Sequence, residues 1–281
     1  MRRGPPGPAT LLHMTTSTSL LPPGSAVSRP RASVSRRRSG RLVTCVGARG
    51  GAGASVFAAA LARTGIRAGL TCLLVDGDPR GSGLDLLLGA EDAPGIRWPD
   101  LALARGTLVA GTLADGLPLI DGIRVLAWDR TASAVPLLPQ SLPAVLEAGL
   151  AEHDLVVLDL PRSDTGLGAL AELVDLGLLV IPAEVRAAAA APKVVEQVYA
   201  GVAEVRLVVR GPSPTGLTAH AIGAVLQLPI VANMRAEPGV SAALDRGEPP
   251  GLRARGPLAR GTRAVLDVLG LKQDGAVLDG H

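Results

Sequence analysis

Residues 41–55 read Arg41-Leu-Val-Thr-Cys-Val-Gly47-Ala-Arg49-Gly50-Gly51-Ala52-Gly53-Ala54-Ser55. The first seven residues are a short apolar run with β-branched side chains, which predicts a buried strand. A glycine cluster follows, and residues 55–63 then form a helical stretch, so the order is strand, glycine-rich loop, helix. A turn of this kind lets backbone N–H groups close around a phosphate at the positive end of the helix dipole. The segment predicts an α/β fold with a phosphate loop after its first strand.

Apolar runs of the same kind recur along the rest of the chain. Strands that are apolar throughout and alternate with helical segments predict a mostly parallel central sheet with helices on both faces. We expect further strands at residues 70–75, 123–127, 154–159, 176–181, 205–209 and 229–232, and helices near residues 139–152, 166–175, 187–203, 215–225 and 257–269.

The composition changes near residue 41. Residues 1–41 contain eight arginines and no acidic residue, so their net charge is +8. Because the whole chain has a net charge of +3, the remaining residues carry −5. A segment with such unbalanced charge and no apolar periodicity does not form a core. We therefore expect a disordered basic tail over residues 1–40, one α/β domain over residues 41–271 and a flexible C-terminus over residues 272–281.

Composition also excludes several classes of function. The chain has 281 residues, of which 47% are hydrophobic, so it can bury a sizeable core, and no apolar run reaches the length of a membrane span. Aromatic residues make up only 1%, which argues against stacking platforms for nucleic acid, and the acidic body offers no basic stripe. Four scattered histidines predict no zinc-type site, and Cys45 and Cys72 lie in apolar runs, as expected of buried free thiols in a reducing compartment.

The loop departs from the ordinary phosphate loop at one position. That loop has a lysine that reaches the β- and γ-phosphates, followed by a Ser or Thr that holds magnesium. Here Ser55 is present, but Ala54 stands at the lysine position. Loss of one charge-assisted contact removes about 1.5–3 kcal/mol, or about 10- to 150-fold in affinity, and hydrolysis suffers at least as much. A dinucleotide-binding loop is the weaker alternative, because the glycine spacing is not Gly-x-Gly-x-x-Gly.

Four ordered segments resemble the MinD/ParA family of P-loop ATPases. Residues 49–55 resemble its deviant Walker A loop, Lys-Gly-Gly-x-Gly-Lys-Thr, with Arg49 at the signature lysine. Residues 74–81 resemble its Asp-x-Asp-Pro-x-Gly segment, residues 153–161 its Walker B strand with the Asp-x-Pro turn, and residues 179–184 the following strand with a Pro-Glu turn. Within this family, the loop, the Trp-Pro-Asp segment at residues 98–100 and the Arg-Gly-Glu-Pro-Pro-Gly segment at residues 246–251 resemble the actinobacterial CpaE-like group. That group includes septum-site-determining and TadZ-like proteins.

The resemblance implies a role for each matching residue. The loop would cradle the phosphates of ATP, Ser55 would hold Mg²⁺, and Asp159 would hold it through water. Asp78 would orient the attacking water or the hydration shell of the metal, Asp76 would support the switch, and Arg49 would reach the phosphates of a partner subunit. A carboxylate that only caps a turn and a solvated arginine remain open alternatives. The implied catalytic residues are Asp78 and Arg49, and the implied cofactor-binding residues are Gly50, Gly51, Ala52, Gly53, Ala54 and Ser55.

These features lead to one expected function and two alternatives. We expect a MinD/ParA-like spatial regulator of septum placement or of pilus or secretion apparatus assembly, with weak or absent ATP hydrolysis. A nucleotide-independent pseudo-ATPase scaffold and a DNA-partitioning ATPase are the alternatives. The resemblance implies a homodimer, protein partners from the division or secretion machinery, and a cytoplasmic location. Any contact with the inner face of the membrane is expected to be electrostatic, through the N-terminal tail.

Overall fold

The computed structural model describes residues 40–81, 83–103, 113–129, 141–162 and 167–271. All of these residues belong to one compact unit of the chain. The predicted basic tail, apart from Gly40, and the predicted flexible C-terminus lie outside the described residues, so both remain predictions.

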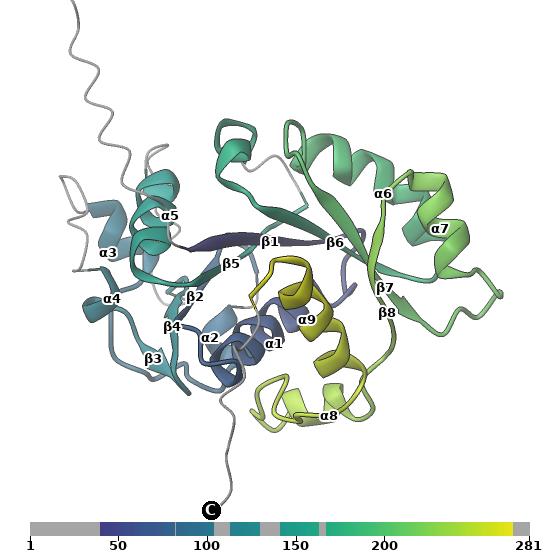
Figure 1. The fold of residues 1–281 in the computed structure, drawn as a ribbon. Coiled ribbons are helices and arrows are strands. Elements are labelled where there is room, and N and C mark those ends of the chain that lie inside the picture. Colours follow the sequence, from purple (N-terminus) through teal and green to yellow (C-terminus); the bar gives the residue numbers. More distant parts are fainter. Residues whose placement is uncertain (1–39, 82, 104–112, 130–140, 163–166, 272–281) are drawn as a thin grey trace, which may run out of the picture. The chain divides into compact units, whose positions relative to one another are not determined.

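The described residues form an eight-stranded sheet with the strand order β3-β4-β2-β5-β1-β6-β7-β8 (Figure 1). Its neighbouring strands are parallel except for the β3–β4 pair. The mostly parallel sheet is therefore confirmed, and each predicted strand lies within a few residues of its observed position. The strands are β1 Arg41–Gly47, β2 Cys72–Asp76, β3 Leu119–Ile120, β4 Ile123–Leu126, β5 Leu155–Asp159, β6 Leu176–Pro182, β7 Val205–Gly211 and β8 Ile230–Arg235.

The helices follow the predicted alternation, with local differences. Residues 167–173 form a 3₁₀ helix, and the short helices α2, α3, α4 and α8 were not predicted, because a run of four to six residues is too short to show helical periodicity. The helices are α1 Ala54–Arg67, α2 Leu84–Leu87, α3 Trp98–Leu103, α4 Leu113–Gly116, α5 Ser141–Glu152, α6 Val185–Val198, α7 Ala219–Leu226, α8 Val240–Leu244 and α9 Pro257–Val268.

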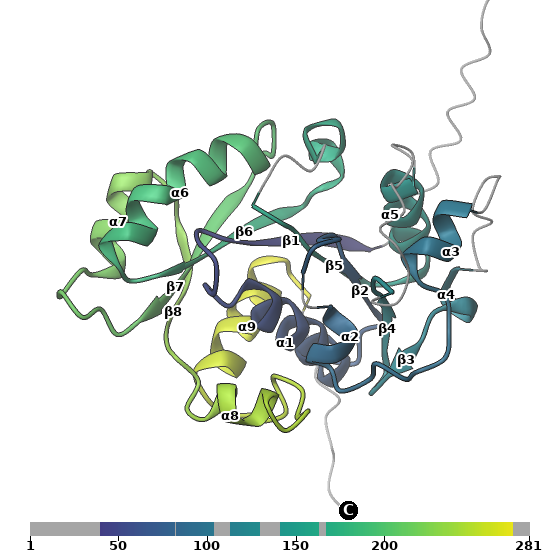
Figure 2. The ribbon, with the colours of Figure 1, turned by 180° about the vertical axis from the view of Figure 1, so that it is seen from behind.

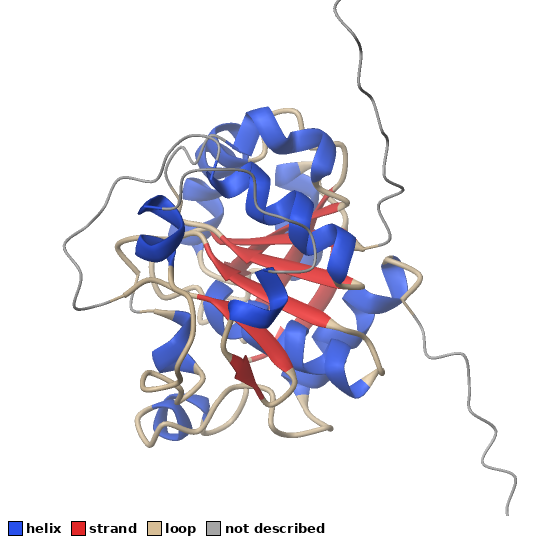
Figure 3. Cartoon of the chain, turned by 90° about the vertical axis from the view of Figure 1, so that its left-hand side faces the viewer, coloured by secondary structure: helices blue, strands red, loops and turns tan. Residues whose placement is uncertain are grey.

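Both faces of the sheet are covered by helices (Figures 2 and 3). In β1, Leu42 and Val46 contribute to the core that contains buried residues of α5, α6 and α7. Val43 and Cys45 point to the opposite face, where α1 and α9 provide most of the buried helical side chains. Alternate residues of the strand thus enter two separate cores. This double burial explains why the central strands are apolar at nearly every position.

The sheet brings distant parts of the chain to one edge. Strands β1, β2, β5, β6 and β7 run parallel, so their carboxyl ends lie together. The glycine-rich loop follows β1, Asp76 ends β2, Asp159 ends β5, and Arg210 lies near the end of β7. Ligands of open α/β sheets bind at this edge, and the candidate site lies here.

Candidate functional site

The glycine-rich loop has the backbone of an anion-binding turn. Gly51 and Gly53 have φ values of 69° and 92°, in the left-handed region that glycine enters at low cost. Gly53 is the N-cap of α1 and provides no side-chain cap. Among the described residues, no acceptor receives the backbone N–H groups of Gly53, Ala54 and Ser55. These donors are therefore available to an anion at the positive end of the helix.

A cavity of about 360 Å³ opens beside this loop. Its wall also includes the carboxyl-end residues of β2 and β5 and the turns that follow them, among them Asp76 and Arg162. Every site residue that the sequence predicted lines this one cavity, namely Arg49, Gly50, Gly51, Ala52, Gly53, Ala54, Ser55, Asp78 and Asp159.

Two buried carboxylates lie on adjacent strands in this wall. Asp76 and Asp159 are paired in the register of β2 and β5 and are 2% and 5% exposed. Burial raises the pKa of each to about 7, and the charge of Asp78 adds to the effect on both. A hydrogen bond from the Ser55 hydroxyl to Asp159 acts in the opposite direction. The buried pair therefore favours a bound proton or cation.

The oxygen donors at this site fit Mg²⁺. The Ser55 hydroxyl and the Asp159 carboxylate line the same cavity and are hard ligands of the kind that Mg²⁺ prefers. Among the described residues, no cluster of three or more His, Cys, Asp or Glu side chains could hold a metal. A magnesium ion here would complete its shell with water and phosphate oxygens, as is usual for this metal.

The Asp76 carboxylate organises the turn after β2. Its two oxygens accept the backbone N–H groups of Asp78 and Leu84, at 3.0 and 3.1 Å. The Asp76 carbonyl accepts the indole N–H groups of Trp98 and Trp128, at 2.6 and 3.1 Å, and the two rings lie 5.7 Å apart. Sequence reasoning missed this pair, because the indoles lie 22 and 52 residues from Asp76 and no local pattern links them.

Asp78 also takes part in its own turn, since one of its oxygens accepts the backbone N–H of Arg80 at 3.0 Å. The carboxylate thus makes the turn-capping contact that was the open alternative, and it lines the cavity as well. Its role towards water is untested and stays a prediction.

Arginine side chains gather on the β6–β7 side of the loop. Arg49 donates from Nε and Nη2 to the two oxygens of Glu184, at 3.1 and 2.8 Å, and this pairing lowers the pKa of Glu184. Arg210 donates from Nη2 to the Gly51 carbonyl at 3.1 Å. Sequence reasoning missed Arg210, although its position directly after a buried run was a usable signal.

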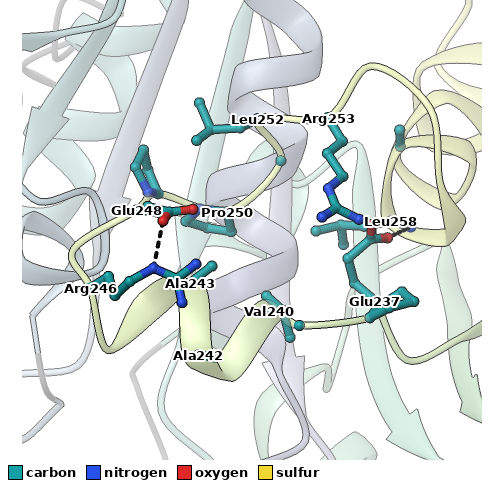
Figure 4. Close-up of a pocket in the computed structure, with 15 residues that line it drawn as sticks. Glu237, Val240, Ala242, Ala243, Arg246, Glu248, Pro250, Leu252, Arg253 and Leu258 are labelled. Atoms are coloured by element: carbon teal, nitrogen blue, oxygen red, sulfur yellow. Dashed lines mark hydrogen bonds and ion pairs between the residues drawn. The ribbon is translucent and has the colours of Figure 1, made fainter.

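A second cavity, of about 210 Å³, lies between α8 and the start of α9 (Figure 4). Pro250 and Leu258 contribute to its wall, and Arg246 donates to Glu248 there at 2.7 Å. None of the predicted site residues lines it. The chemistry that the sequence predicted is therefore confined to the cavity beside the glycine-rich loop.

Comparison with solved structures shows which proteins share this architecture. A ParA family ATPase from Chlorobium tepidum has a TM-score of 0.62 and 18% identity, over 84% of this chain and 94% of that chain. MinD from Aquifex aeolicus has a TM-score of 0.63 and 19% identity, over 82% and 97%. The chain has the fold of the MinD and ParA ATPases. MinD from Pyrococcus horikoshii, solved with Mg-ADP, matches with a TM-score of 0.60 and 18% identity, over 84% of this chain and 99% of that chain.

Sequence comparison finds an uncharacterised relative. An uncharacterised protein of Mycobacterium tuberculosis is 44% identical over 232 residues, which cover 82% of this chain and 64% of the relative. The chain thus spans less than two thirds of the relative's length. No family model matches the sequence. In the part of the chain that the structure describes, no helix combines the length and the apolar character needed to cross a membrane.

Proposed function

We propose that this chain is a MinD/ParA-like nucleotide switch of the CpaE-like group, which positions the septum or a pilus or secretion apparatus. One observation carries the proposal. The uncapped start of α1 and the buried Asp76–Asp159 pair share one cavity in a MinD/ParA fold, although Ala54 replaces the loop lysine. The cavity has donors for phosphate and acceptors for Mg²⁺, but it lacks the lysine that stabilises the transition state. We therefore infer binding of Mg·ATP with slow or absent hydrolysis.

A nucleotide-independent scaffold is the second candidate. Ala54 favours it, because the loop has lost its own cation. The Arg49–Glu184 ion pair also favours it, since it holds the signature arginine within its own chain. Ser55, Asp78 and Asp159 favour the switch, because a scaffold has no need of them at this edge.

Equilibrium binding of Mg·ATP to the full chain separates the two candidates. The only two tryptophans both donate to the Asp76 carbonyl, so intrinsic fluorescence reports on the turn beside the cavity. A switch gives saturable binding of Mg·ATP with a change in tryptophan emission, whereas a scaffold gives neither.

Restoring the lysine gives the matching gain-of-function test. We expect Ala54→Lys to bind Mg·ATP at least tenfold more tightly, because the variant regains one charge-assisted contact in an existing cradle. Isothermal calorimetry of wild type and variant measures the difference. A folded variant that binds no better than wild type contradicts the phosphate-loop interpretation.

The resemblance also supplies the proposed partners. We infer a homodimer, protein partners from the division or secretion machinery, and a place in the cytoplasm or at the inner face of the membrane. A DNA-partitioning role is the least supported, because the chain outside the arginine-rich tail carries a net negative charge.

A further inference from the structure

Arg210 reaches the phosphate loop from the opposite side to the carboxylates. In the sheet order, β2 and β5 lie on one side of β1, whereas β6 and β7 lie on the other. Asp76 and Asp159 therefore flank the loop on one side, and Arg210, near the end of β7, approaches it on the other. Its Nη2 donates to the Gly51 carbonyl at 3.1 Å, and its Nη1 lies 3.0 Å from where a Cβ on Gly53 would be. The guanidinium thus lies against the residue that caps α1.

The guanidinium of Arg210 has no acidic partner of its own. Within the described residues it makes no ion pair, because the nearby Glu184 binds Arg49 through both oxygens. Arg210 is half-buried, and its described hydrogen bonds use one of five N–H groups. Burial and the charge of Arg49 lower its pKa. A half-buried cation beside a second cation is the arrangement that an anion stabilises.

The loop itself supplies no cation next to Gly53, because Ala54 stands at the lysine position. Ala54 follows Gly53 directly, so the loop contributes N–H donors but no charge of its own at this point. Arg210 lies 159 residues beyond Gly51 in the chain, on β7, and brings a planar guanidinium that pairs with phosphate in bidentate geometry.

We propose that Arg210 binds the phosphates of the ligand in place of the missing loop lysine, so that the charge reaches the cradle from β7. The proposal rests on the proposed function, since it takes a polyphosphate as the ligand. Its guanidinium lies against the loop itself, at the Gly51 carbonyl and beside Gly53, so it contacts the phosphates that ADP and ATP share.

The test compares Arg210 variants on ligands with and without a base. Calorimetry follows Mg·ATP, Mg·ADP and Mg·tripolyphosphate with wild type, Arg210→Ala and Arg210→Lys. We expect Arg210→Ala to weaken all three at least tenfold, by loss of a charged hydrogen bond, and Arg210→Lys to recover part of the affinity. The double variant Ala54→Lys/Arg210→Ala should regain Mg·ATP affinity, because the cation returns from the loop.

Arg206→Ala is the matched control, because Arg206 lies on the same strand at the far end and pairs with Glu204. It should leave all affinities unchanged, and unfolding curves should show that each variant folds. Equal or tighter binding by Arg210→Ala overturns the proposal, since Arg210 then makes no contribution to phosphate binding or obstructs the site. In another outcome, wild type binds tripolyphosphate but not ATP, while Arg210→Ala binds neither. That result contradicts the proposed nucleotide switch but supports phosphate binding by Arg210. If wild type binds none of the three, both fail.

Discussion

At the scale of single residues, the buried Asp159 makes stability depend on pH. Its pKa is about 7 in the folded chain against 3.8 as the ordinary value. The folded state therefore holds a proton that the unfolded state releases, and stability falls as pH rises from about 4 to about 7, by up to about 1.4 kcal/mol per pH unit. Asp159→Asn should remove this contribution, whereas Asp76, whose pKa is also about 7, keeps its own. Thermal unfolding should show similar midpoints at pH 4.5 and a higher midpoint for the variant at pH 8. Mg²⁺ should narrow the gap at pH 8 by stabilising wild type only, and equal midpoints at pH 8 without Mg²⁺ contradict the prediction.

At the scale of elements, local patterns predicted what local forces determine. The strands of the parallel part of the sheet and the start of α1 were predictable, because burial on both faces makes a strand apolar throughout and a glycine cluster marks the loop. The two-residue strand β3 was not predicted, because so short a run shows no pattern. The gathering of Arg49 to Ser55 with Asp78 and Asp159 followed from parallel strand ends. The Trp98–Trp128 pair and the reach of Arg210 were not predictable, because long-range side-chain contacts have no signature in one sequence.

The packing of α1 on the sheet gives the element-scale prediction. A Cβ on Gly65 would lie 2.6 Å from the Cys72 Sγ and 3.0 Å from a methyl group of Leu155. Alanine favours helix over glycine by about 1 kcal/mol, but overpacking costs about 1–3 kcal/mol. Gly65→Ala should therefore lower stability in urea unfolding. Adding Cys72→Ala should restore part of it, and a double-mutant cycle without coupling contradicts the close approach.

At the scale of the whole molecule, the ion pair between Arg49 and Glu184 should control dimerisation by nucleotide. The MinD/ParA resemblance gives Arg49 a role at a partner's phosphates, yet here both of its hydrogen bonds to Glu184 stay within the chain. Glu184→Gln weakens the pair without loss of a helix cap, because Glu184 makes no side-chain cap to α6. We expect this variant to dimerise more readily than wild type with Mg·ATP, and Arg49→Ala not to dimerise. Analytical ultracentrifugation with and without Mg·ATP measures both. Glu248→Gln, at the exposed Arg246–Glu248 pair, is the matched control and should behave as wild type. A dimer that forms equally without nucleotide, or one that survives Arg49→Ala, contradicts this role, because the arginine then bridges no phosphates between subunits.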